Sequence, residues 1–231
     1  MRLMSAGAGT PARDPVHHPL FARFYARCSV AAETRLGMAA TRERLLSGLS
    51  GRVIEIGAGN GLNFARYPGA VAEVVAIEPE RSLRQLAAQA AVRAEVPVDV
   101  VPGAAEALPV KSEAYDAAVL SLVLCSVRDV QRALAEVRRV LRPGGELRFF
   151  EHGRGGGPAM LFTQRTLDRT VWPLLSGGCH LSREPVAELR AAGFELGPYR
   201  RVFLPEKGLR LPSSYCVLGV ARKPPESRAE S

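Results

Sequence analysis

A short apolar run that ends in three alternating glycines constrains this chain more than any other feature. Residues 52–56 are a strand candidate, and Gly57, Gly59 and Gly61 follow directly. Glycine permits a sharp backbone turn and a close approach to a ligand, because a Cβ atom would collide there. The pattern therefore predicts a strand that ends in a ligand-binding turn, as in the first unit of α/β nucleotide-binding folds.

From residue 51 onward, short apolar runs alternate with segments of helical periodicity. The predicted strands are 52–56, 74–77, 98–101, 116–120 and 147–150, and the predicted helices are 62–67, 82–91 and 129–141. After Glu151 the pattern predicts helices at 158–175 and 184–192 and two strands at 194–203 and 215–221. Strands separated by helices imply βαβ units with right-handed crossovers, so the sequence predicts one α/β domain with a largely parallel sheet.

The acidic residues around the glycine turn narrow the kind of ligand. Glu78, about 20 residues beyond the turn, ends the second strand and is placed to accept hydrogen bonds from both ribose hydroxyls of an adenosine. A dinucleotide fingerprint would need glycine where Leu62 stands, and Glu55 would repel a pyrophosphate. S-adenosylmethionine carries a sulfonium and an ammonium and no phosphate, so an acidic turn suits it. A plain strand-to-helix turn is the alternative for the loop alone.

The net charge and the positions of the cysteines bear on other classes of partner and site. The net charge of +8 favours anionic partners, but the positive residues are mostly single arginines spread along the chain. The cysteines at 28, 125, 179 and 216 stand far apart without a C-x-x-C pair, so neither a metal site nor a disulfide framework is expected. No apolar run reaches the roughly 18 residues of a membrane span, and a cytoplasmic location is expected.

Four motifs occur in a characteristic order, at 53–61, 75–79, 103–109 and 140–145. Together they resemble the class I S-adenosylmethionine-dependent methyltransferases with a type 11 methyltransferase domain, a group that includes the quinone-biosynthesis enzymes. The segments 63–68, 122–127 and 164–184, with the pair Glu151 and His152, resemble more closely the methyltransferase-like thiol S-methyltransferases. The animal members of that group carry an N-terminal membrane anchor, which this sequence lacks, so membrane attachment is not expected.

The resemblance implies a fold and a set of cofactor contacts. The fold is a Rossmann-like, doubly wound α/β sheet of seven strands, mostly parallel with the last strand antiparallel, plus N-terminal helices. The implied contacts with S-adenosylmethionine are Glu55 near the ammonium, Gly57, Ala58 and Gly59 under the methionine moiety, Glu78 at the ribose, Pro79 beside the adenine, Ala105 and Glu106 at the adenine edge, and Leu122 near the sulfonium.

The expected domain organisation follows from these motifs. Residues 1–15 are expected to be a flexible N-terminus and 223–231 a polar tail. A single domain at 16–222 would hold a helical lid at 16–50, a cofactor-binding core at 51–152 and a substrate-side region at 153–222. Two helical stretches are expected within the lid, at 17–27 and 31–49.

Two residues are candidates for catalysis. His152 ends the fifth strand, at the sheet edge where ligands gather in open α/β folds, and is the candidate base; a hydrogen-bonded structural histidine is the alternative. Asp168 would orient the acceptor or the base, with a helix-surface carboxylate as the alternative. Cys125 is expected to be a small buried residue rather than a nucleophile, and Cys179 could line a pocket.

The sequence thus predicts methyl transfer from S-adenosylmethionine to a small-molecule acceptor, with a thiol sulfur as the leading candidate. C- or O-methylation of a quinone, lipid or secondary metabolite is the alternative, because acceptor contacts lie outside the cofactor motifs. A non-catalytic nucleotide or nucleic-acid binding module is the alternative of another class. No basic run is interleaved with aromatic residues as nucleic-acid binders require, so no nucleic-acid partner is expected. The pattern does not set the oligomeric state.

Overall fold

The computed structural model describes residues 19–225, and the predicted flexible N-terminus at 1–15 lies outside them. Within this part, the strands are β1 (Gly51–Ile56), β2 (Val71–Ile77), β3 (Val98–Val101), β4 (Tyr115–Ser121), β5 (Leu141–His152), β6 (Glu195–Phe203) and β7 (Tyr215–Arg222). The helices are α1 (Pro19–Arg35), α2 (Met38–Leu46), α3 (Arg81–Ala91), α4 (Val130–Val140), α5 (Pro158–Arg169), α6 (Trp172–Leu175) and α7 (Pro185–Ala191), with 3-10 turns η1 (Phe64–Arg66) and η2 (Pro212–Ser214).

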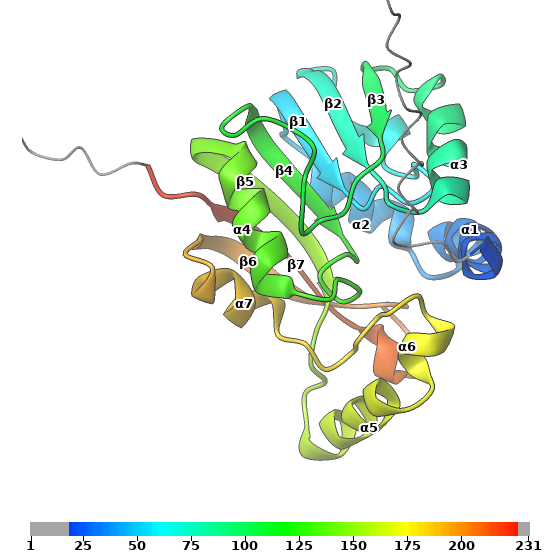
Figure 1. The fold of residues 1–231 in the computed structure, drawn as a ribbon. Coiled ribbons are helices and arrows are strands. Elements are labelled where there is room, and N and C mark those ends of the chain that lie inside the picture. The colour runs from blue at the N-terminus through cyan, green and yellow to red at the C-terminus, as the bar shows by residue number, and fades with distance from the viewer. Residues whose placement is uncertain (1–18, 226–231) are drawn as a thin grey trace, which may run out of the picture.

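The described strands form one seven-stranded sheet in the order β3-β2-β1-β4-β5-β7-β6 (Figure 1). The pairs among β3, β2, β1, β4 and β5 are parallel. The last strand, β7, runs antiparallel to both β5 and β6. The expected doubly wound sheet with an antiparallel last strand is confirmed.

Helices cover both faces of the sheet, and each face has its own apolar core. Ile54 on β1 and Phe149 on β5 pack with Leu134 of α4 and with α7 on one face. Val53 and Phe150, the neighbours of those strand residues, pack with α2 and α3 on the other face. Successive strand side chains point to opposite faces, so a strand buried on both sides is apolar along its whole length. This explains the continuous apolar runs in the sequence.

Two helices begin where capping predicts. Asp129 caps α4 by accepting a hydrogen bond from the backbone N–H of Arg132 at 3.0 Å, as its position before the apolar periodicity indicates. Glu80 caps α3 in the same way, through the backbone N–H of Leu83 at 2.8 Å. Both helices therefore start just beyond the carboxyl end of a strand, and their first turns border the edge of the sheet where the glycine turn lies.

The predicted helix at 62–67 was wrong, because only the short turn η1 forms there. Gly59 and Gly61 adopt left-handed backbone angles, with φ of 59° and 78°, which a right-handed helix does not allow. Pro68 then ends the segment on its other side, because the residue before a proline avoids the helical region. The chain passes from β1 to β2 through an irregular loop instead of a full helix.

Two further helix boundaries differ from the prediction. The expected helix at 158–175 is broken after Arg169, where Thr170 leaves helical geometry, and Pro173 begins a new turn because it cannot donate within a continuing helix. In the N-terminal region the break falls at Gly37, with φ of 72°, and not at residues 28–30. The first helix therefore continues to Arg35 and lies against α2 and α3 (Figure 1).

Candidate active site

The glycine turn at the carboxyl end of β1 has the tight geometry that its sequence predicts. Gly57 and Gly59 have φ of 70° and 59°, a region that favours glycine. The backbone N–H groups of Gly57 and Ala58 donate to the carbonyl of Ile77 at 2.8 and 3.0 Å, which fixes the turn against β2. A Cβ at Gly57 would lie 2.7 Å from a methyl carbon of Val123, so no larger residue fits.

Glu78 lies directly against this turn. Its carboxylate accepts hydrogen bonds from the backbone N–H of Gly59 at 2.7 Å and of Glu80 at 2.9 Å, and the residue is 4% exposed. Burial raises the pKa of Glu78 to about 7, against the lowering effect of these two N–H donors. Each oxygen retains a second lone pair, so the carboxylate can also accept two hydroxyl groups. This arrangement fits the ribose of the expected adenosine cofactor.

Glu55 is buried one strand away, with both oxygens engaged. Its carboxylate accepts hydrogen bonds from the Asn63 side chain at 2.8 Å and from the Tyr67 hydroxyl at 2.7 Å. Burial raises the pKa of Glu55, while these two donors and the nearby Arg42 lower it. The predicted contact of Glu55 with the cofactor ammonium stays a prediction, and the structure adds that Glu55 anchors the loop around η1.

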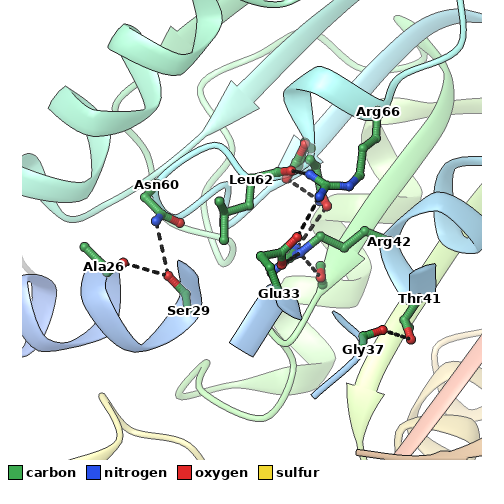
Figure 2. Close-up of polar contacts among 12 residues, drawn as sticks. Ala26, Ser29, Glu33, Gly37, Thr41, Arg42, Asn60, Leu62 and Arg66 are labelled. Atoms are coloured by element: carbon green, nitrogen blue, oxygen red, sulfur yellow. Dashed lines mark hydrogen bonds and ion pairs between the residues drawn. The ribbon is translucent and has the colours of Figure 1, made fainter. Parts of the chain in front are cut away.

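A buried ionic network joins the N-terminal helices to this loop (Figure 2). Arg42 on α2 donates to Glu33 of α1 at 2.8 Å, to Asn63 at 2.9 Å and to Ser121 at the end of β4 at 3.3 Å. Arg66 on η1 donates to the other oxygen of Glu33 at 2.8 Å. The network therefore ties α1 and α2 to the carboxyl ends of the strands.

The helix α1 lies over the glycine turn itself. A Cβ at Gly59 would lie 3.2 Å from the ring of Tyr25, and the side chain of Asn60 donates to the hydroxyl of Ser29 at 3.1 Å (Figure 2). The pKa of Tyr25 is raised, chiefly by burial. These contacts are those of a helix that covers the glycine turn, and the lid role of this region stays a prediction.

The remaining predicted cofactor residues border the same edge. Pro79 follows Glu78, and its carbonyl accepts a hydrogen bond from Arg84 at 2.9 Å. Ala105 is buried, and the Glu106 carboxylate accepts the backbone N–H of Arg128 at 3.0 Å, which joins the loops after β3 and β4. These contacts place the loop that holds Ala105 and Glu106 against the start of α4, and their predicted roles at the adenine stay predictions.

Leu122 has an unusual backbone at the end of β4. Its φ is 60°, which non-glycine residues rarely adopt and which often marks a functional position. Its N–H donates to the carbonyl of Phe150 at 2.7 Å. Its side chain contacts two groups of buried residues, one that includes Ala58 and one that includes Cys125. Leu122 thus lies between the glycine turn and a second group of reactive side chains.

That second group consists of Cys125, His152 and Cys179. The Cys179 Sγ lies 3.4 Å from His152 Nδ1, and one donor atom from each residue lies within 4.8 Å of the others. The hydrogen bond with Cys179, together with burial, raises the pKa of the Cys125 thiol well above its usual range. Burial lowers the pKa of His152, but the hydrogen bond to Cys125 and nearby negative groups outweigh it, so the pKa is raised.

Two carboxylates position the loops that hold these cysteines. Glu151 is fully buried and accepts the backbone N–H groups of Val123, Leu124 and Cys125 at 2.9, 3.0 and 3.3 Å. Burial raises the pKa of Glu151 to about 7 against these donors. The sequence indicates no role for Glu151 beyond the resemblance of the Glu151 and His152 pair, although its place beside His152 at a strand end was a signal.

Asp168 holds the other loop. Its oxygens accept the backbone N–H groups of Leu181 and Ser182 at 2.7 and 2.9 Å and the Ser182 hydroxyl at 2.7 Å. The backbone N–H of His180 donates to the carbonyl of Cys125 at 2.7 Å, which joins the two loops. Asp168 is therefore placed to orient the loop that carries Cys179, a role that the sequence did not indicate.

Comparisons with known proteins agree with this geometry. Residues 54–149 match the family described as methyltransferase domain. The chain is 36% identical over 169 residues to the human thiol S-methyltransferase TMT1A, across 68% of each chain. It is 35% identical over 155 residues to human TMT1B, across 64% of this chain and 63% of that protein. It is also 32% identical over 170 residues to the quinone C-methyltransferase UbiE of Syntrophotalea carbinolica, across 69% of this chain and 70% of UbiE.

Solved structures share the fold. A SAM-dependent methyltransferase of Thermotoga maritima superposes with a TM-score of 0.64 at 24% identity, across 88% of this chain and 97% of the other. The N-methyltransferase NodS of Bradyrhizobium japonicum superposes with a TM-score of 0.60 at 19% identity, across 80% and 93%. The seven-stranded architecture is therefore that of known methyltransferases.

Proposed function

Because the chain belongs to the S-adenosylmethionine-dependent methyltransferase family, we propose that it transfers a methyl group from this cofactor to the sulfur of a small thiol. The match to TMT1B spans 63% of that protein, so the acceptor is a proposal and does not follow from family membership. S-adenosylmethionine is the methyl donor of the family, and when bound it supplies an already activated methyl group on its sulfonium.

The cofactor assignment is supported most directly by Glu78. A buried carboxylate held 2.7 Å from the N–H of Gly59 leaves lone pairs at the edge of a turn that only glycines can form. The residues proposed to hold the cofactor are the turn at Gly57, Ala58 and Gly59, with Glu78 at the ribose. These carboxylate acceptors suit a ribose and an ammonium, and Glu55, at the glycine turn, would repel a pyrophosphate.

A thiol acceptor is supported by the relatives and by the chemistry that it needs. The curated relatives TMT1A and TMT1B are named thiol S-methyltransferases. Thiols reach a few per cent of thiolate near neutrality and are strong nucleophiles, so alignment supplies most of the rate. His152 is proposed to take the acceptor proton where needed, and Asp168 is proposed as a positioning residue, since its oxygens are engaged by the loop at Leu181 and Ser182.

The test is methyl-label transfer from S-adenosylmethionine to a panel of alkyl thiols, quinols and amines, with S-adenosylhomocysteine binding measured by calorimetry. We expect label on thiols. We expect Gly59→Val to weaken binding at least tenfold, because a β-branched residue is strained at φ of 59° and meets Tyr25. Gly69→Ala is the matched control, because nothing lies within 4 Å of its added Cβ. Unchanged affinity in Gly59→Val would reject the cofactor site.

The second candidate is C-methylation of a quinone, favoured by the 32% identity to UbiE across 70% of that protein. Label on quinols and on no thiol would select it, and the cofactor assignment would stand.

No helix within residues 19–225 is long and apolar enough to cross a membrane. A cytoplasmic location stays a prediction from the sequence.

A further inference from the structure

The cluster of Cys125, His152 and Cys179 has the composition and spacing of a metal site. Its members come from three separate places in the chain: the loop after β4, the last residue of β5 and the loop after α6. Their donor atoms all lie within 4.8 Å of one another, and the Cys179 Sγ lies 3.4 Å from His152 Nδ1. The sequence predicts no metal site, because these residues are too distant along the chain to form a recognisable ligand motif.

The distances match what zinc requires. Zinc binds thiolate sulfur at about 2.3 Å and imidazole nitrogen at about 2.0–2.1 Å, in tetrahedral geometry. Ligand atoms at those lengths lie roughly 3.6–3.8 Å from each other. The 3.4 Å separation of Cys179 and His152 is close to that value, and the upper limit of 4.8 Å for the other pairs leaves only small side-chain shifts.

The chemistry of the donors selects a thiophilic cation. Cys125 and Cys179 are 2% and 5% exposed and pack with the apolar side chains of Leu122, Leu167, Leu181 and Trp172. The Cys125 Sγ also lies 3.5 Å from the Ser126 hydroxyl. Two thiols and one imidazole are ligands for zinc or a similar cation, and not for magnesium or calcium. Three protein ligands of the type Cys2His are the pattern of a catalytic zinc site, which keeps a fourth position for water or substrate.

The structure holds the ligands in place from outside the cluster. The Glu151 carboxylate fixes the backbone of Cys125 at 3.3 Å, and Asp168 fixes the loop beyond Cys179 through Leu181. The 2.7 Å bond from the N–H of His180 to the carbonyl of Cys125 joins the two loops. Such support is what orients metal ligands in known sites, where its loss typically weakens metal affinity by about 10–100-fold.

A buried polar group beside the cluster lacks a partner. The indole Nε1 of Trp172, which packs against this group of residues, has no hydrogen-bond acceptor among the residues that the structure describes. A buried donor without an acceptor is costly, and such groups often mark a place where a ligand completes the site. An anionic sulfur next to the cluster would provide that acceptor.

We propose that Cys125, His152 and Cys179 bind one zinc ion and leave its fourth position to the acceptor thiol. The assignment of the fourth position to the acceptor thiol rests on the proposed function. On binding, the thiol would displace a water and release its proton to solvent. The sulfur lone pair would then form the new carbon–sulfur bond, while the bond from the methyl carbon to the sulfonium sulfur breaks and its electrons pass to S-adenosylhomocysteine. His152 would act as a ligand in place of a base.

The first experiment measures metal in untagged protein purified with a non-thiol reductant and without chelator. We expect about one zinc per chain by mass spectrometry of the metal, and we expect cobalt(II) added to metal-free protein to give the near-ultraviolet absorption of a thiolate complex. Cys125→Ser and Cys179→Ser should each lower cobalt affinity at least tenfold. Cys28→Ser, an exposed cysteine on α1, is the matched control and should bind as the wild type does.

Reduced wild-type protein that is isolated without zinc and gives no cobalt–thiolate absorption would overturn the site, even if the variants do not fold. A disulfide between Cys125 and Cys179, with no metal uptake after reduction, would also overturn it. S-adenosylhomocysteine binding and thiol methylation on the same preparation separate this proposal from the proposed function. Thiol methylation that is unaffected by complete zinc removal would overturn the acceptor clause alone. Loss of methylation on zinc removal, with cofactor binding intact, would support it.

Discussion

At the scale of single residues, backbone conformation connects the sequence to the site. Gly57 and Gly59 occupy left-handed positions that their spacing predicts, whereas Leu122 adopts φ of 60° without any sign in the sequence. Strain at a non-glycine residue costs about 1–3 kcal/mol and persists where neighbouring contacts enforce it. Here the backbone N–H groups of Val123 and Leu124 donate hydrogen bonds to the Glu151 carboxylate, which fixes the residues that follow Leu122. The strained turn presents Leu122 and Cys125 at the carboxyl edge.

Glu78 gives a prediction for pH. Its pKa of about 7 leaves it mostly protonated at pH 6 and mostly ionised at pH 8. Because the ionised carboxylate accepts both ribose hydroxyls, cofactor binding favours deprotonation, and affinity rises with pH. We expect the affinity for S-adenosylhomocysteine to increase about tenfold from pH 6 to pH 8. Calorimetry across this range, on wild type and Glu78→Gln, checks it. The amide variant cannot ionise, so an equally steep rise in both proteins would contradict the prediction.

The cofactor half of the site could be predicted from sequence, but the Cys125, His152 and Cys179 cluster could not. Gly57 and Gly59 directly follow β1 and Glu78 directly follows β2, and these two strands are neighbours in the sheet, so the spacing along the chain predicts that the three residues lie close together. Cys125 and Cys179 are separated by the strand β5 and the helices α4, α5 and α6, and only the folded sheet brings them together. His152 could be placed at the sheet edge from its position after an apolar run, but its partners could not.

At the scale of elements, breaks in the helices determine where α1 ends and where α6 begins. The periodicity of 158–175 predicts one helix, yet Pro173 splits it into α5 and α6, and the short α6 turns Trp172 toward the cysteine cluster. Hydrophobic periodicity indicates which face of a segment is apolar. It does not reveal a break between two helices when the apolar face is the same on both sides of the break. Likewise, Gly37 places the end of α1 several residues beyond the predicted break, which brings Glu33 to Arg42.

The attachment of α1 can be tested through Glu33. Its side chain is 10% exposed and pairs with Arg42 and Arg66, so Glu33→Gln removes the carboxylate that both guanidinium groups contact directly. We expect a loss of about 3 kcal/mol in the free energy of unfolding, measured by urea denaturation. Glu73→Gln is the control, because its ion pair with Arg52 is 42% exposed on each side and should cost less than about 1 kcal/mol. Equal losses in both variants would show that the network does not anchor α1.

At the scale of the whole molecule, the order of the strands in the sheet is the feature that local sequence patterns predict least well. The alternation of strands and helices predicts a parallel α/β sheet, but the order β3-β2-β1-β4-β5-β7-β6 could be expected only from the resemblance. The reversal between β1 and β4 opens the carboxyl edge to a ligand, as in other doubly wound sheets. The antiparallel β7 lies beside β5 and places Cys216 opposite His152, so the start of β7 borders the same edge.

The net charge of +8 is also a property of the whole molecule, and it tests the nucleic-acid alternative. Many arginines are already paired with carboxylates, among them Arg42, Arg139 and Arg148, which leaves less of the excess free to contact phosphates. We therefore expect only weak duplex or single-strand DNA binding at 50 mM salt, with a Kd of about 10⁻⁴–10⁻⁶ M, and its loss by 200 mM. Fluorescence anisotropy with labelled oligonucleotides measures this. Cofactor affinity, which involves no phosphate, should change little over the same range. Sequence-dependent binding that persists at 200 mM salt would instead favour a nucleic-acid partner, because only contacts to the bases survive when the counterion contribution is removed.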